Sequence, residues 1–213
     1  EVVKLVIDSI PLVLIISVFI GAVCTIQMKL NIMSPLIPMY TVGLATREII
    51  LLEFSSSILC LILAGKVGSS ITSEIGTMRV TEQIDALEIM GINSANFLVL
   101  PKITAFVSFI PVLVTMSTAT SILGGYLISV ITGIVSPEIF IYGIQTMFVE
   151  WYVWYALIKS LFFAFVISSV ASYFGYHVTG GALQVGKAST NAVVTSSILI
   201  LLLDVILTNL MLQ

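Results

Sequence analysis

Five long apolar runs, separated by short stretches that hold most of the charges, dominate this sequence. A helix needs about 20 consecutive apolar residues to cross the hydrocarbon core of a bilayer, and each run has or approaches that length. Only 9% of the 213 residues are charged, against about 25% in soluble domains. The sequence therefore predicts an all-α polytopic membrane protein and excludes a soluble globular one. The five expected transmembrane helices lie near 5–28, 49–65, 97–131, 151–176 and 192–212.

The chain shows no internal repeat and no low-complexity linker, so we expect a single transmembrane domain over residues 1–213. The third run is long for one crossing, and Pro111 and the Gly124–Gly125 pair predict that it is tilted or kinked. The stretch 132–150 has apolar residues at helical spacing with carboxylates between them, which favours a short interfacial helix over a sixth span. The Trp and Tyr residues within 151–155 mark where the fourth span enters the headgroup layer.

The basic residues predict the orientation, because cytoplasmic segments carry an excess of Lys and Arg. A cytoplasmic amino terminus puts five basic residues inside and two outside. The five are Lys4, Lys66, Arg79, Lys102 and Lys187, and the two are Lys29 and Arg47. We therefore expect a cytoplasmic amino terminus and, after five spans, a periplasmic carboxyl terminus.

The segment between the second and third runs predicts a short cytoplasmic amphipathic helix over residues 77–90. Thr77 is a suitable N-cap, and Gly91 is a suitable stop. Apolar side chains recur at the i, i+4 and i+7 spacing of one helix face, at Val80, Ile84 and Leu87. Such a ridge can be buried in a groove of a soluble partner.

Acidic residues form a stripe beside that ridge. Glu82, Asp85 and Glu88 recur every three residues, and Arg79 is placed to pair with Glu82. The alternative is a solvated loop helix that lies on the membrane. Anionic headgroups would repel the acidic face, so a protein partner is favoured.

A set of ionisable residues inside expected spans consists of Glu53 in the second, Lys159 in the fourth and Asp204 in the fifth. Charges at membrane depth cost roughly 2.5–3.5 kcal/mol each, so they pair or line a wet cavity. We expect Lys159 to bridge Asp204, Glu53 or both. Three interpretations stay open: a packing ion pair, the border of a lipid headgroup cavity, and a proton relay.

Other features point away from chemistry in this chain. Residues Gly181–Ala188 nearly match a phosphate-binding loop, but Ala188 stands where the Mg²⁺-binding hydroxyl belongs and no strand precedes it. Cys24 and Cys60 are interpreted as small buried apolar residues, and the lone His177 as an interfacial polar residue. No catalytic residue, metal site or cofactor is expected, and a net charge of −3 gives no basic surface for nucleic acid.

The run Glu74–Gly91, with Ala64–Ser69 before it and Leu100–Lys102 after it, resembles the MlaE/YrbE family of permeases. These are the membrane subunits of ABC transporters that work with MCE (mammalian cell entry) proteins. The likeness continues through Leu157–Ser160, Gly175–Tyr176, Gly180–Ala182, Val193–Val194 and Leu203–Asp204. One departure is Leu52, which stands where the family has an Arg before Glu53; Arg47 is a candidate substitute.

The resemblance implies a homodimeric permease of the bacterial inner membrane that carries phospholipid between that membrane and a periplasmic MCE protein. Two copies of a cytoplasmic ATPase, which bind ATP and Mg²⁺, power it, and the permease itself is not an enzyme. The loop helix corresponds to the family's coupling helix. The expected ATPase-coupling residues are Glu74, Arg79, Glu82, Asp85 and Glu88, and the expected lipid-cavity residues are Glu53, Lys159 and Asp204.

Two other functions use the same residues differently. An ion-coupled secondary transporter would use Glu53, Lys159 and Asp204 as its ion site, and inverted repeats would support it, but the sequence shows none. A membrane scaffold without transport would leave these charges purely structural. Co-purification with a soluble ATPase separates the ABC permease from both.

Overall fold

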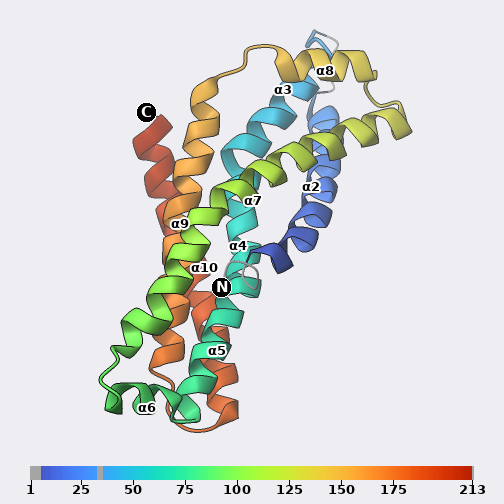
Figure 1. Ribbon diagram of the computed structural model, residues 1–213. Coiled ribbons are helices and arrows are strands. Elements are labelled where there is room, and N and C mark those ends of the chain that lie inside the picture. Colours follow the sequence, from blue (N-terminus) through green and yellow to red (C-terminus); the bar gives the residue numbers. More distant parts are fainter. Residues whose placement is uncertain (1–5, 33–35, 213) are drawn as a thin grey trace. The chain divides into compact units, whose positions relative to one another are not determined.

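The computed structural model describes residues 6–32 and 36–212 of the chain (Figure 1). Five helices in that part are long and apolar enough to cross a membrane, so the predicted all-α fold with five spans is confirmed. They are Ile7–Asn31, Tyr40–Val80, Ser94–Thr132 (α7), Glu150–Tyr176 (α9) and Ala182–Leu212 (α10). Lys4 and Leu5, at the expected start of the first span, lie outside the described residues.

The chain forms two compact units, which are described separately. Unit 1 consists of Glu1–Ser9, Cys60–Pro111 and Lys159–Gln213, and unit 2 of Ile10–Leu59 and Val112–Ile158. The first four spans each contribute residues to both units.

The first two spans are built from several helical pieces. The first consists of a 3-10 turn, η1 (Ile7–Ser9), and α2 (Ile10–Asn31). The second alternates α and π geometry in the order α3 (Tyr40–Ile49), η2 (Ile50–Ile58), α4 (Leu59–Leu63), η3 (Ala64–Gly68) and α5 (Ser69–Val80). The segments η2 and η3 have π-helical geometry, which is wider than an α-helix. Such segments are rare in proteins, and those that occur are often at functional sites. The predicted span 49–65 is therefore too short at both ends.

The glycines and hydroxyl residues after position 64 suggested a loop, but the helix runs through them because they serve close packing. The Thr72 hydroxyl donates to the Gly68 carbonyl at 3.0 Å and to the Ala171 carbonyl at 2.9 Å. A Cβ added at Gly76 would lie 3.1 Å from Cγ1 of Val185. Small residues at these positions let α5 approach α9 and α10 closely, as in other membrane helix pairs.

Helix α7 is continuous over 39 residues, with Pro101 and Pro111 inside it. At 1.5 Å per residue it is about 58 Å long, roughly twice the hydrocarbon core of a bilayer. The expected single helix at 97–131 is confirmed. The short helix expected within 132–150 is also confirmed, as α8 (Pro137–Gln145), which at nine residues cannot span.

Unit 2 is held together by small residues that bring α2 against α7. A Cβ at Gly21 would lie 1.7 Å from the Ser121 carbonyl oxygen, so the two backbones are in direct contact. Farther along, the hydroxyl oxygens of Ser17 and Ser117 are 2.7 Å apart. Helices α3 and α8 meet in the same way at Gly143, whose Cβ would lie 2.1 Å from the Tyr40 carbonyl oxygen.

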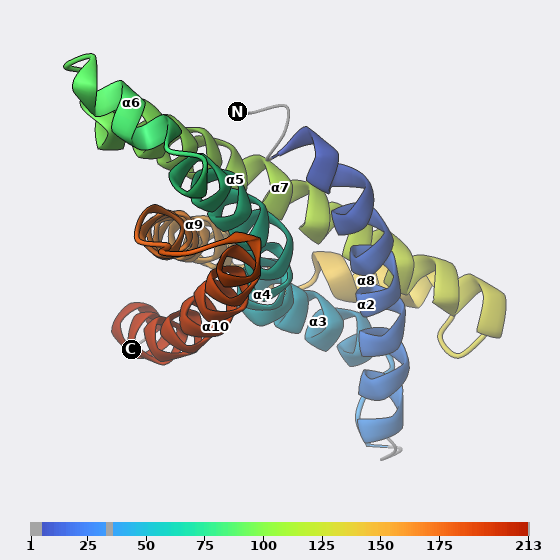
Figure 2. The ribbon, with the colours of Figure 1, turned by 90° about the horizontal axis from the view of Figure 1, so that it is seen from below.

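In unit 1, α10 lies along α5, and the short helix α6 (Gln83–Ile89) follows α5 at the lower end of Figure 1 (Figures 1 and 2). Helix α10 starts at Ala182, ten residues before the expected 192–212 span. The segment 182–188, which with Gly181 nearly matches a phosphate-binding loop, therefore forms the first turns of this helix. Cys24 of unit 2 and Cys60 of unit 1 are buried, as predicted.

Candidate functional site

The predicted coupling helix 77–90 is not a single helix. Thr77 is no N-cap: it lies inside α5, and its hydroxyl donates to the Ser73 carbonyl at 2.7 Å. Helix α5 is the last segment of the second span and ends at Val80, because Glu82 takes a left-handed conformation with φ of 60°. Helix α6 then begins in a new direction. The prediction failed because the left-handed turn falls on a glutamate, a residue that rarely adopts positive φ.

The predicted stop at Gly91 is confirmed. Its φ is 78°, and its amide donates to the Glu88 carbonyl at 2.9 Å while the Ile92 amide donates to the Leu87 carbonyl at 3.0 Å. These two bonds form the glycine-dependent Schellman motif that ends many helices. The end of α6 is therefore fixed by its backbone.

Arg79 pairs with Asp85. The helical spacing had predicted a pair with Glu82 instead. Nη1 of Arg79 lies 2.5 Å from Oδ1 of Asp85. The expected pairing required Arg79 and Glu82 to be one turn apart on a single helix, and the left-handed Glu82 removes that geometry. The observed pair ties α6 back to α5.

Glu74, another expected coupling residue, forms an ion pair within unit 1. Its Oε1 lies 3.0 Å from Nζ of Lys102 on α7. The Lys102 side chain is 1% exposed and that of Glu74 27%. Glu74 therefore connects α5 to α7 and is not presented to a partner as a free acidic group.

Glu88 accepts two hydrogen bonds that attach α6 to its neighbours. The Ser94 hydroxyl, at the start of α7, and the Tyr176 hydroxyl, at the end of α9, both donate to its Oε1 at 2.9 Å. The two hydroxyl oxygens are themselves 2.7 Å apart. These bonds, first from Ser94 and then from Tyr176, lower the pKa of Glu88 below its ordinary value, with a smaller contribution from the Arg79 charge.

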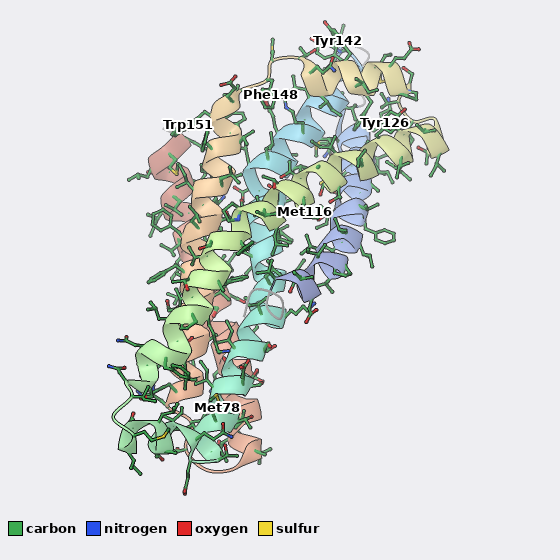
Figure 3. The ribbon with its side chains drawn as sticks, in the orientation of Figure 1. Met78, Met116, Tyr126, Tyr142, Phe148 and Trp151 are labelled. Atoms are coloured by element: carbon green, nitrogen blue, oxygen red, sulfur yellow. The ribbon has the colours of Figure 1, made fainter. Side chains whose placement is uncertain are left out.

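The surface that α6 presents differs from the predicted ridge. Ile84 is fully buried, so it is not available to a partner. The exposed apolar residues are instead Ile89 and Met90, which are 87% and 65% exposed, and Glu82 is exposed at the other end of the helix. We call Glu82, Ile89 and Met90 the α6 tip; α6 lies near the labelled Met78 in Figure 3.

The buried charges are placed in part as predicted. Lys159 on α9 is fully buried and forms an ion pair with Asp204 on α10, within unit 1. Glu53 belongs to unit 2, inside the π segment η2, where the Ser57 hydroxyl donates to its carboxylate at 3.2 Å. The Lys159–Asp204 bridge is thus present.

The sequence missed Arg47 and Lys102 as interior residues. Both were counted as loop charges, yet they are 2% and 1% exposed. Arg47 donates to the carbonyls of Ile144, Thr146 and Met147 at 2.6, 2.8 and 3.1 Å. One signal was available: Arg47 adjoins one expected apolar run and Lys102 lies inside another, where a charge is costly unless it has partners inside the protein.

These features define a multi-pass helical membrane protein with ion pairs between its helices and a short connecting helix fixed to three spans. A comparison with known families gives the particular class. The family described as "Permease MlaE" matches residues 1–210, and the chain belongs to this family.

Three relatives are named probable ABC transporter permease proteins. The chain is 34% identical to one from Synechocystis over 210 residues, which is 97% of this chain and 78% of that protein. It is 36% identical to one from Rickettsia bellii over 207 residues, 95% of this chain and 78% of the relative. It is 33% identical to one from Pyropia yezoensis over 161 residues, 76% of this chain and 61% of the relative.

Proposed function

We propose that this permease is the membrane subunit of an ABC transporter that moves phospholipid between the bacterial inner membrane and a periplasmic MCE protein. In this proposal two copies pair in the membrane as single permease domains, each with a cytoplasmic amino terminus and a periplasmic carboxyl terminus. A cytoplasmic ATPase dimer binds ATP and Mg²⁺ and hydrolyses the nucleotide. Family membership and the relatives' names support the ABC permease, and the motif around Glu74–Gly91 supports the lipid and MCE assignments.

The observation that carries the proposal is the α6 tip. Ile89 and Met90 are exposed at the end of a short helix that is fixed to its unit by the Arg79–Asp85 pair and by the bonds to Glu88. An exposed apolar pair at one end of the helix and an acidic residue at the other suit docking into a groove with basic residues at its edge. Because α6 is hydrogen-bonded to α7 and α9, movement of a docked ATPase would move these two spans as well.

This assignment changes the roles of the five expected coupling residues. Glu82 remains a direct contact with the ATPase. Arg79, Asp85, Glu88 and Glu74 hold α5 and α6 in the geometry that presents the tip. Glu53, in unit 2, and the Lys159–Asp204 pair, in unit 1, are each proposed as lipid-cavity residues.

Docking is tested by charge reversal and by an apolar-to-acidic change that leave the internal bonds intact. Glu82→Lys and Ile89→Asp are expected to abolish co-purification with the ATPase and the ATP hydrolysis coupled to transport. Leu36→Asp is the matched control, because Leu36 is 92% exposed in the connection between the first two spans, which the proposal places on the opposite side of the membrane. ATPase binding that persists in both test variants would refute the docking assignment.

Family membership favours this function over the ion-coupled secondary transporter that the same buried charges suggested. The Lys159–Asp204 pair is compatible with either mechanism. An ATPase partner is expected only for the ABC permease, so co-purification also decides between these two functions.

A further inference from the structure

Unit 2 contains an apolar pocket of about 300 Å³, at the small end of the range for ligand sites. It lies between Arg47 and Leu51 of the second span, the Val114–Ile122 stretch of α7, and the region from Ile144 to Leu157. Thr115 and Ala119 on its rim are exposed on the surface of α7. The labelled Phe148, which also lines the pocket, follows α8 in Figure 3.

The pocket offers almost no hydrogen bonds to water. Its two threonines, Thr115 and Thr118, donate their hydroxyl protons to the backbone of α7, at the carbonyls of Val112 and Val114, both at 2.9 Å. A bound water needs two to four polar partners. An apolar ligand is therefore a better occupant than water.

Arg47 is the exception in this lining. Its Nη1 and Nη2 donate to three carbonyls at the end of α8, and Nη2 also lies 3.4 Å from Oε1 of Glu48. Its Nε is buried and has no acceptor among the residues that the structure describes. A buried donor on a charged group without an acceptor is rare in folded proteins. The guanidinium is held rigidly by its other bonds, with one N–H left for a ligand.

We propose that this pocket binds one acyl chain of a membrane phospholipid within a single copy of the permease. The chain packs against the α7 and α9 walls, and an ester or phosphate oxygen near its head accepts the Nε–H of Arg47. The positive charge of Arg47 complements the phosphate. The lipid's identity rests on the proposed function, whereas the apolar chain with a head oxygen follows from the lining itself.

The test uses the full chain in nanodiscs of phosphatidylcholine doped with phosphatidylglycerol that carries a diazirine midway along one acyl chain. After illumination, adducts are mapped by mass spectrometry. We expect adducts at pocket residues such as Ala119 and Ala156, above the yield at Ile131, which is 76% exposed on α7 and outside the pocket. Pocket yields no higher than at Ile131 would overturn the proposal.

Pocket-filling variants give the sharper comparison. Thr115→Phe and Ala119→Phe are expected to reduce pocket adducts by about tenfold or more, since a close-packed cavity leaves no room for the chain. Leu123→Phe is the matched control, on the same helix, 56% exposed and outside the lining. Unchanged labelling in both pocket variants would refute the site.

The role of Arg47 is tested with a diazirine alkane that has no head oxygen, which we expect to label the pocket several-fold less than the phospholipid. Equal labelling would refute the contribution of the Nε–H. This test is independent of the docking test at the α6 tip. If Glu82→Lys loses ATPase binding but the pocket gives no adducts, the proposed function stands and this inference is refuted. If the pocket gives adducts but the unaltered protein does not bind an ATPase, this inference stands and the proposed function is refuted.

Discussion

Nζ of Lys102 lies 3.0 Å from Oε1 of Glu74, and the ion pair joins α7 to α5 within unit 1. The two partners are buried unequally, since the ammonium is on a side chain that is 1% exposed and the carboxylate on one that is 27% exposed. Removing one partner of a buried pair leaves the other charge uncompensated, and the more deeply buried charge suffers more.

This asymmetry predicts that Glu74→Gln destabilises the protein more than Lys102→Met. Glu74→Gln removes the carboxylate beside a buried ammonium, and we expect a loss near the lower end of the roughly 3–5 kcal/mol seen when buried pairs are broken. Lys102→Met leaves a carboxylate that water can still reach. Apparent Tm values of the purified variants in detergent measure the difference, with Glu150→Gln at an exposed site as control. A larger loss in Lys102→Met would contradict the argument.

Lys159→Ala is expected to impair lipid transport more than assembly with the ATPase. Under the proposed function, the Lys159–Asp204 pair borders the headgroup cavity, and loss of the ammonium leaves the Asp204 carboxylate without its cation. Transport is measured in proteoliposomes that contain the ATPase and MCE partners, and assembly by size-exclusion chromatography. Failure of the variant to assemble would instead assign the pair to helix packing.

Glu88 gives a pH prediction. Hydrogen bonds to its carboxylate lower the pKa, so their contribution to the stability of α6 is full above the unfolded-state pKa and is lost as pH falls through the folded-state value. Ser94→Ala should raise the pKa of Glu88 more than Tyr176→Phe does, because the Ser94 bond has the larger effect. A ¹³C NMR titration of the Glu88 carboxyl group measures both, and an unchanged pKa in both variants would rule out this cause.

Gly21→Ala should disrupt the contact between α2 and α7. The added Cβ would lie 1.7 Å from the Ser121 carbonyl oxygen, and a backbone atom cannot rotate away. We expect a loss of about 3 kcal/mol or more, beyond the usual range for overpacking. Gly186→Ala is the control, since its Cβ would meet nothing within 4 Å and a helix gains up to about 1 kcal/mol from this change. Apparent Tm values should move in opposite directions.

The number and approximate positions of the spans could be read from the sequence because lipid exposure requires long apolar runs. Their ends could not. Residues 66–76 suggested a loop because glycine and serine are typical of turns, yet Gly76 lets α5 approach Val185 of α10. That reason lies on another helix, which a local pattern does not contain.

The charged residues show the same limit. Spacing along one helix predicted Arg79 beside Glu82, but the left-handed backbone at Glu82 brings Asp85 to Arg79 instead. The Lys159–Asp204 pair could be predicted because the cost of a charge in lipid leaves few alternatives. Glu74 lies outside the expected spans, so the sequence places no such constraint on it, and its partner Lys102 is apparent only once α5 and α7 are seen together.

The direct backbone contact between α2 and α7 also bears on how motion in this protein is measured. With Gly21 against Ser121 and Ser17 beside Ser117, neither helix can slide or separate from the other without steric overlap or a broken hydrogen bond. A pair of spectroscopic labels on the outer faces of these two helices should report one distance throughout a transport cycle. That pair would give a constant reference distance with which changes in the distances between other helices are compared.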